Sequence, residues 1–145
     1  MIKESTSCGV IIFSNDDQET KFLLVKELRG QNFSFSKGHT EKGESHLQTA
    51  LREVFEEVNL TPAIVDGYMY INTYSFRLDE NTLIKKTVHY FLGIANSMVV
   101  QKQLQEIDEI LWLNYNDAYE KLTYLNDKIN LEKAYNDLKD LKLVK

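Results

Sequence analysis

The chain has little cysteine and a shortage of positive charge. Cys8 is the only cysteine among 145 residues. An internal disulfide is therefore impossible, which fits a protein of a reducing compartment. Seventeen lysines and arginines stand against 22 aspartates and glutamates, so the formal net charge is −5. This charge argues against a general affinity for nucleic acid or for acidic membranes.

Long apolar runs, repeats and linkers are also missing. No apolar segment approaches the length that spans a membrane. The first residues, MIKESTSCGVIIF, lack a long apolar stretch after a basic start, so we expect no signal peptide. Together with the lone cysteine this predicts a cytoplasmic location. Without a linker, residues 1–145 are most simply one domain, and a hydrophobic content of 43% is ordinary for a soluble globular protein.

The residues that are present predict both strands and helices. Short apolar runs indicate strands at Ser7–Phe13, Lys21–Lys26, Tyr68–Phe76, Lys86–Ala95 and Glu109–Leu113. The polar Asn15-Asp16-Asp17 predicts a hairpin turn between the first two. Helical periodicity indicates helices at Ser45–Val58, Asn116–Leu122 and Asp127–Leu141. Strands with helices on both sides of a mixed sheet predict an α/β or α+β sandwich.

The helix expected at Ser45–Val58 has well-marked ends. Ser45 followed by Gln48 fits a capping box, in which the serine oxygen accepts from the backbone and the glutamine reaches back. Asn59 stands where the helix should stop, since asparagine tolerates the left-handed conformation. Pro62 blocks continuation. Before the helix, Gly38, Gly43 and the polar residues between them predict a loop that brings backbone groups close to a ligand.

This helix carries a group of glutamates. Glu53, Glu56 and Glu57 stand at i, i+3 and i+4 and share one face. Carboxylates held this close repel one another, and a hard cation such as Mg²⁺ or Mn²⁺ relieves the repulsion. The usual ligand of such a metal site is a phosphate chain, whose charge the cation neutralises. The alternative is an ordinary solvated helix face, but the fixed frame with Gly38 and Glu44 argues against it.

The spacing of these residues resembles the signature of the Nudix hydrolases, G-x5-E-x7-R-E-U-x-E-E-x-x-U with U aliphatic. The matching positions are Gly38, Glu44, Arg52, Glu53, Val54, Glu56, Glu57 and Leu60. The family usually has glycine where this chain has Asn59, a mild departure at a helix end. The resemblance implies a Nudix-type α/β/α sandwich with a mixed β-sheet. It also implies metal-dependent hydrolysis of a nucleoside diphosphate linked to another group.

The resemblance assigns roles by position. Glu53, Glu56 and Glu57 would bind Mg²⁺ or Mn²⁺ together with Gly38. Glu53 or Glu57 would act as the base, and the sequence leaves that choice open. Arginine offers a rigid fork to carboxylates, so Arg52 would orient Glu53 or pair with Glu44.

Two further stretches resemble the asymmetric diadenosine tetraphosphate hydrolases within this family. FSFSKGHTEKGE is similar to their pattern WxxPKGHxExGE, with Ser36 in place of the usual proline. KKTVHYFLGIA, at Lys85–Ala95, is similar to their KTVxYxLA strand. Glu106 resembles a downstream glutamate that this subgroup places near the metals. The alternative interpretation is that Glu106 is an ordinary exposed acid.

The same resemblance suggests substrate contacts. Lys37, His39 and Lys86 would supply positive charge or hydrogen bonds to a phosphate chain. Tyr90, and also Tyr74, would stack on adenine, because aromatic faces accept any base. Each tyrosine has an alternative as a structural residue. Tyr90 stands in an apolar strand, which favours the core for it.

These observations predict an enzyme that hydrolyses a nucleoside polyphosphate, diadenosine tetraphosphate to ATP and AMP being the first choice. One alternative is another Nudix activity, on RNA 5′ ends, modified nucleoside triphosphates or nucleotide sugars. Another is a Nudix-fold nucleotide-binding module without turnover, whose expected mark is loss of the box carboxylates. All are present here. We expect no membrane partner and no stable nucleic-acid partner, and the oligomeric state stays open.

Overall fold

The computed structural model describes residues 1–102 and 105–145. Its elements are β1 (Ile2–Ser14), β2 (Lys21–Glu27), β3 (Phe33–Ser34), β4 (Ser36–His39), α1 (His46–Val58), β5 (Ala63–Asp79), β6 (Thr82–Ile94), β7 (Ile107–Leu113), α2 (Tyr115–Lys121) and α3 (Leu125–Asp140). The strands form one sheet in the order β3-β2-β1-β6-β5, with β4 paired to β1 and β7 paired to β2. Strands β1 and β6 run parallel, whereas the other paired strands are antiparallel.

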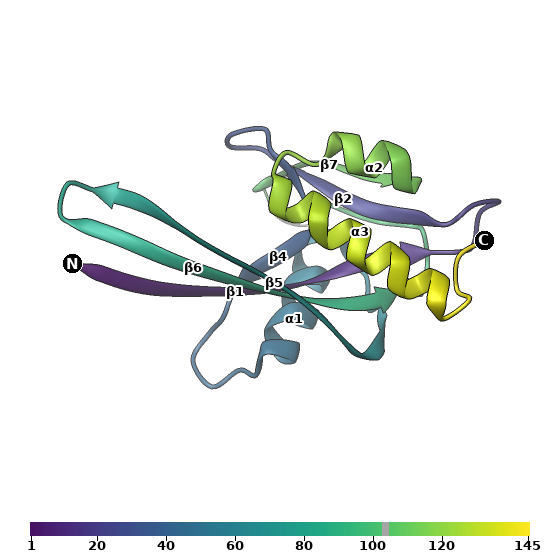
Figure 1. The fold of residues 1–145 in the computed structure, drawn as a ribbon, viewed down its shortest axis with the longest axis horizontal. Helices are drawn as coiled ribbons and strands as arrows, with labels where there is room; N and C mark the ends of the chain where they lie inside the picture. Colours follow the sequence, from purple (N-terminus) through teal and green to yellow (C-terminus); the bar gives the residue numbers. More distant parts are fainter. Residues whose placement is uncertain (103–104) are drawn as a thin grey trace.

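Helices cover both faces of this mixed sheet, as the sequence predicts. Helix α1 lies on one face, and α3 crosses the opposite face with α2 beside it (Figure 1). Strand β1 lies in the middle and is buried from Ser7 to Ser14. Its side chains alternate: Val10 and Ile12 join the core under α1, while Ile11 and Phe13 join the core under α3. The predicted sandwich is therefore confirmed.

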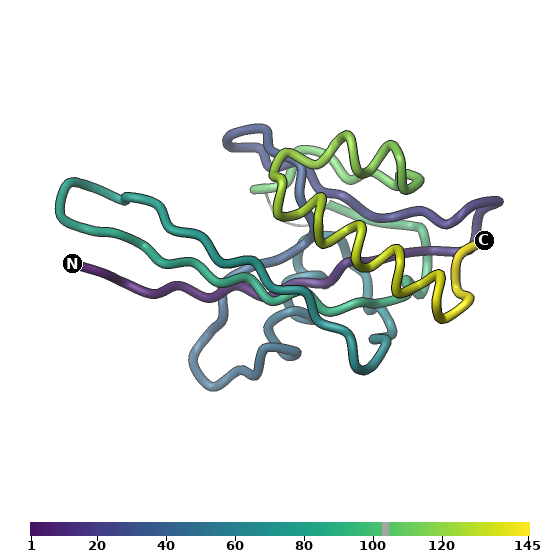
Figure 2. Tube along the Cα trace, in the orientation of Figure 1, coloured from purple at the N-terminus to yellow at the C-terminus, as the bar shows by residue number. Residues whose placement is uncertain are grey.

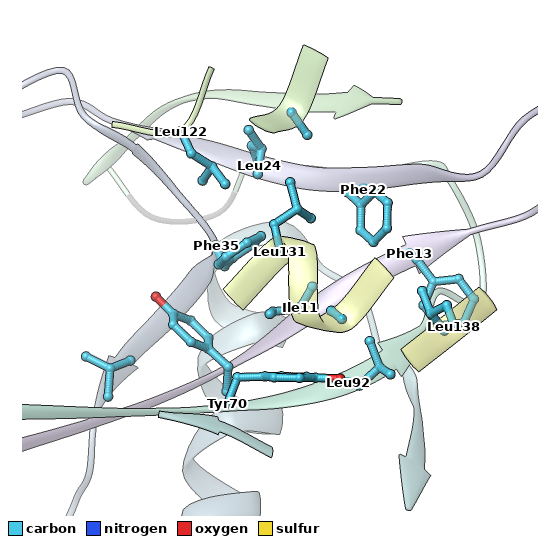
Figure 3. Close-up of a cluster of buried hydrophobic side chains, with 14 residues drawn as sticks. Ile11, Phe13, Phe22, Leu24, Phe35, Tyr70, Leu92, Leu122, Leu131 and Leu138 are labelled. Atoms are coloured by element: carbon cyan, nitrogen blue, oxygen red, sulfur yellow. The ribbon is translucent and has the colours of Figure 1, made fainter. Parts of the chain in front are cut away.

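The core under α3 is the larger of the two buried clusters. Leu131 and Leu138 of α3 belong to this cluster with Ile11, Phe13 and Phe22 of the sheet (Figure 3). All five side chains are fully buried. This packing places the beginning of α3 beside strand β5, at the end of the sheet where that strand leaves the body of the molecule.

Three strands are longer than their apolar runs predict. Strand β1 begins at Ile2, β5 runs from Ala63 to Asp79, and β6 begins at Thr82. Their outer parts run side by side as an arm that extends away from the helices (Figure 2). The arm is largely exposed, so its residues lack the buried alternation by which strands are recognised. Backbone pairing, for example of Ile2 with Leu83, holds it in the sheet.

The segment before α1 corrects a sequence expectation. Gly38 was expected to begin a loop, but it lies with His39 in strand β4, and the loop starts only at Thr40. Strand β4 pairs with β1, where Ser36 stands opposite Val10 and Lys37 opposite Gly9. A side chain on Gly9 would overlap the Ser36 carbonyl and the Lys37 side chain. The strand is therefore set by a close backbone approach, which leaves no apolar period in the sequence.

Helix α1 begins and ends as its sequence predicts. The Ser45 side chain accepts from the Gln48 N–H, and the Gln48 side chain accepts from the Ser45 N–H, which completes the capping box. Asn59 ends the helix in the left-handed conformation, at φ 61° and ψ 38°. The buried residues Ala50, Val54 and Val58 hold the helix on the sheet. The glutamates of the motif are thus carried by a helix that is anchored at both ends.

Candidate active site

The three glutamates of α1 lie at graded depth in the structure. Glu57 is 6% exposed, the Glu53 side chain 13% and the Glu56 side chain 42%. The gradient follows from helix geometry, because Glu57 and Glu53 stand next to the buried Val58 and Val54, whereas Glu56 is turned outward. The helix therefore presents carboxylates from its buried edge to its solvent edge.

Arg52 links these carboxylates to the segments before the helix. Its Nε and Nη2 donate to the two oxygens of Glu44 at 2.7 and 3.0 Å. Its Nη1 donates to Glu53 Oε1 at 2.8 Å and to Glu56 Oε2 at 3.1 Å. Nη2 also donates to the His39 carbonyl at 3.0 Å. The guanidinium lowers the pKa of Glu44 to about 2. Arg52 therefore hydrogen-bonds both Glu53 and Glu44, the two partners that the sequence suggests for it.

Glu57 is held separately from the other two glutamates. The Ser36 hydroxyl donates to its Oε1 at 2.6 Å, and the Lys37 N–H donates to the same oxygen at 3.2 Å. Burial raises the pKa of Glu57 to about 7, and burial also raises the pKa of Glu53. The Glu57 carboxyl is therefore suited to exchanging a proton near neutral pH.

Gly38 is placed directly against Glu53. A Cβ on Gly38 would overlap the Glu53 carboxyl group. A side chain at position 38 would therefore displace the Glu53 carboxylate from its place against β4. The backbone of β4 and the acidic face of α1 meet here.

Glu106 is exposed, and its charge reaches this region. Burial raises the pKa of Glu53, and the charge of Glu106 adds a small effect in the same direction. Burial and two lysines lower the pKa of His39, an effect that Glu106 partly opposes. The Glu106 carbonyl accepts from the Leu28 N–H at 2.7 Å. The structure therefore places Glu106 within electrostatic range of Glu53, and its part in metal binding stays a prediction.

The donor set suits a hard divalent cation in its chemistry. Carboxylate oxygens and a backbone carbonyl are the ligands that Mg²⁺ and Mn²⁺ prefer. Over residues 1–102 and 105–145, no three acidic, histidine or cysteine side chains converge on one point. The three carboxylates of α1 have different hydrogen-bond partners. Arg52 donates to Glu53 and Glu56, whereas Ser36 donates to Glu57.

Positive charge gathers on strands β4 and β6, which lie on either side of β1. Lys86 is 8% exposed, and its Nζ lies 3.4 Å from Ser5 Oγ and 3.4 Å from His39 Nδ1. Burial and the nearby Lys37 lower the pKa of Lys86 to about 8. Burial, Lys86 and Lys37 together lower the pKa of His39. Lys86 and His39 are thus neighbours, and Lys37 lies within electrostatic range of both.

Tyr90 corrects one expectation. It is 1% exposed and packs edge-on against Phe35, with ring centroids 5.2 Å apart. Strand β6 alternates, and Tyr90 falls on the side that α3 covers, together with Val88 and Leu92. Its ring is therefore part of the core and offers no face to a base.

Tyr74 is placed differently. It is 42% exposed on β5, directly opposite Lys86 on β6. Asp127 and Tyr124 lie near enough to raise the pKa of Tyr74, after the larger effect of burial. Tyr124, at the start of α3, is 50% exposed. The sequence gives no signal for Tyr124, because only the fold brings it near β5.

Residues 4–135 match the family described as the NUDIX domain. The chain belongs to the Nudix family. It is 31% identical over 143 residues to the asymmetrical bis(5'-nucleosyl)-tetraphosphatase of Sus scrofa, covering 89% of this chain and 92% of that protein. The Caenorhabditis elegans Ap4A hydrolase has a similar structure, with a TM-score of 0.84 and 25% identity, covering 94% of this chain and 98% of the other.

The Nudix fold is also found in the NUDIX domain of Shewanella oneidensis NrtR, complexed with ADP ribose. That similarity has a TM-score of 0.67 at 19% identity, covers 92% of this chain and 87% of the other, and shows the fold alone. Family and relatives together identify this Nudix protein as an enzyme of the phosphoric-anhydride hydrolase type. Nudix hydrolases in general use divalent metals. Over the described residues, no helix has the length and apolar character needed to span a membrane.

Proposed function

We propose that this Nudix hydrolase cleaves diadenosine tetraphosphate to ATP and AMP. The observation that carries the proposal is that Glu57 accepts from the Lys37 N–H and lies within electrostatic range of the Lys37 charge, which also acts on Lys86. A long phosphate chain needs both acidic and basic groups, because its charge must be neutralised while water is activated. The similarity to named tetraphosphatases supports this choice of substrate.

In this proposal Glu53, Glu56 and Glu57, with the Gly38 carbonyl and Glu106, would hold Mg²⁺ or Mn²⁺. When bound, the cation supplies charge neutralisation at the phosphates and lowers the pKa of water. Glu53 or Glu57 accepts the proton of the attacking water. The water oxygen forms the new bond to phosphorus, and the anhydride P–O bond breaks to release ATP and AMP.

In this proposal the remaining residues bind the substrate and orient the catalytic glutamates. Lys37, His39 and Lys86 would hold phosphate oxygens through charge-assisted hydrogen bonds. Tyr74 and Tyr124 expose their rings on neighbouring elements, β5 and the start of α3, and would stack on an adenine. Arg52 would keep Glu53 in place while it pairs with Glu44.

Two alternatives compete with this proposal. The first is another Nudix activity, on RNA 5′ ends, modified nucleoside triphosphates or nucleotide sugars, and the net charge of −5 does not favour RNA. The second is nucleotide binding without turnover, which the complete carboxylate set does not favour. The proposed setting is cytoplasmic, with a nucleoside polyphosphate as partner and no stable nucleic-acid partner.

The proposal is tested with a substrate panel. Purified protein with Mg²⁺ is given diadenosine tetraphosphate, ADP-ribose and 5′-triphosphorylated RNA, and kcat/KM is measured for each. We expect the dinucleotide to have the highest kcat/KM. Higher values for ADP-ribose or RNA would refute the substrate while leaving the Nudix chemistry standing. Binding of all three without cleavage would favour the non-catalytic alternative.

A further inference from the structure

Ser36 makes a contact to the site that the sequence did not predict. It is 0% exposed on β4, and its hydroxyl donates to Glu57 Oε1 at 2.6 Å. A charged acceptor and a short distance make this one of the stronger kinds of hydrogen bond. The pattern that this segment resembles has proline at the same position. Proline has no side-chain donor, so the contact is a feature of this chain.

The contact fixes one oxygen of the carboxylate and leaves the other available. Oε1 of Glu57 accepts from the Ser36 hydroxyl and also from the Lys37 N–H at 3.2 Å. Within the described part of the chain, no hydrogen bond to Oε2 is found. The two donors come from adjacent residues of one strand, so they grip Oε1 from a rigid backbone. Oε2 then remains available for a cation or a water molecule.

Ser36 also complements Arg52. Arg52 contacts Glu53 at 2.8 Å and Glu56 at 3.1 Å, and among the described contacts it makes none to Glu57. The three carboxylates of α1 are therefore held by hydrogen bonds from two different residues. The Arg52 guanidinium binds Glu53 and Glu56, whereas the Ser36 hydroxyl on strand β4 binds Glu57.

We propose that Ser36 is a positioning residue that fixes the orientation of Glu57 for metal binding and hydrolysis. The proposal rests on the function proposed above. Ser36 acts on the reaction through Glu57 and makes no contact with substrate. Its loss should therefore lower kcat and weaken metal binding while leaving KM for the nucleotide nearly unchanged.

The test compares Ser36→Ala, Ser36→Thr and the control Ser14→Ala. Ser14 is also a buried serine, 1% exposed at the far end of β1, where its hydroxyl accepts from the Asp16 N–H. We measure kcat and KM for diadenosine tetraphosphate, and Mn²⁺ affinity without substrate by electron paramagnetic resonance. Thermal unfolding shows whether each variant is folded.

For Ser36→Ala we expect kcat to fall roughly tenfold to a hundredfold, the value of a hydrogen bond to a charged group. Mn²⁺ affinity should fall as well, and KM should change by less than about twofold. Threonine keeps the hydroxyl, so Ser36→Thr should recover most of kcat, and Ser14→Ala should match the unmodified protein. If Ser36→Thr is poorly folded, the proposal is tested by the Mn²⁺ affinity of Ser36→Ala compared with that of the unmodified protein.

Two outcomes would overturn the proposal: Ser36→Ala with unchanged kcat and Mn²⁺ affinity, or equal losses in Ser36→Ala and Ser14→Ala. These outcomes differ from failure of the proposed function, in which the unmodified protein itself hydrolyses no nucleotide of the panel.

Discussion

At the scale of single residues, the site depends on how each carboxylate is held. Arg52 holds Glu44, Glu53 and Glu56, while Glu57 is buried under donors from β4. The sequence motif predicted these glutamates by spacing alone. It could not predict their different environments, because burial and the Ser36 contact arise only when β4 packs against α1.

Replacing Glu53 or Glu57 by glutamine keeps the size of the side chain and removes its charge. We expect kcat to fall by about a hundredfold or more at each position, because electrostatic and proton-transfer effects have that magnitude. Circular dichroism should show an unchanged fold. Two folded variants that keep nearly full activity would mean that these glutamates are only a polar helix face.

Lys86 gives the site a pH dependence. Burial lowers its pKa to about 8, so the free enzyme carries the charged ammonium below that pH and loses it above. The profile of kcat/KM reports groups of the free enzyme, so kcat/KM should fall as the pH rises through about 8. Lys86→Ala should be slower at neutral pH and lack this limb, whereas Lys86→Arg should extend activity to higher pH. An identical alkaline limb in Lys86→Ala would show that another group titrates.

At the scale of elements, the predicted and observed structures differ where strands are exposed or short. The apolar runs located the buried parts of β1, β2 and β6 and the half-buried part of β7, and the caps located α1. The arm of β1, β5 and β6 was underestimated because exposed backbone pairing leaves no apolar period. Strand β4 was missed because it rests on the close approach of Gly9 to Ser36.

The cap of α1 offers a test at this scale. Ser45→Ala removes the side chain that accepts from the Gln48 N–H at 3.1 Å. We expect a loss of about 1 kcal/mol in the free energy of unfolding, as for other N-caps. Denaturant unfolding measures this loss. Gln48→Ala should lower the free energy of unfolding by a smaller amount. No change in either variant would show that sheet packing alone fixes the start of α1.

At the scale of the whole molecule, the sheet brings together parts that are far apart in the chain. Glu57 of α1 contacts β4, and Lys86 of β6 lies beside His39 of β4. Tyr74 of β5 stands opposite Lys86 and near Tyr124 at the start of α3. The sequence supplied the acidic and basic members through the family resemblance. It placed Tyr90 among the stacking candidates and missed Tyr124, because only the fold decides which side of a strand faces a helix.

The central claim is metal-dependent asymmetric cleavage of diadenosine tetraphosphate. The most direct measurement is chromatography of the products formed by purified protein with Mg²⁺, beside a sample in excess chelator. The account predicts equal amounts of ATP and AMP with Mg²⁺ and no products in chelator. Full turnover in chelator, or a symmetric split into two molecules of ADP, would contradict it.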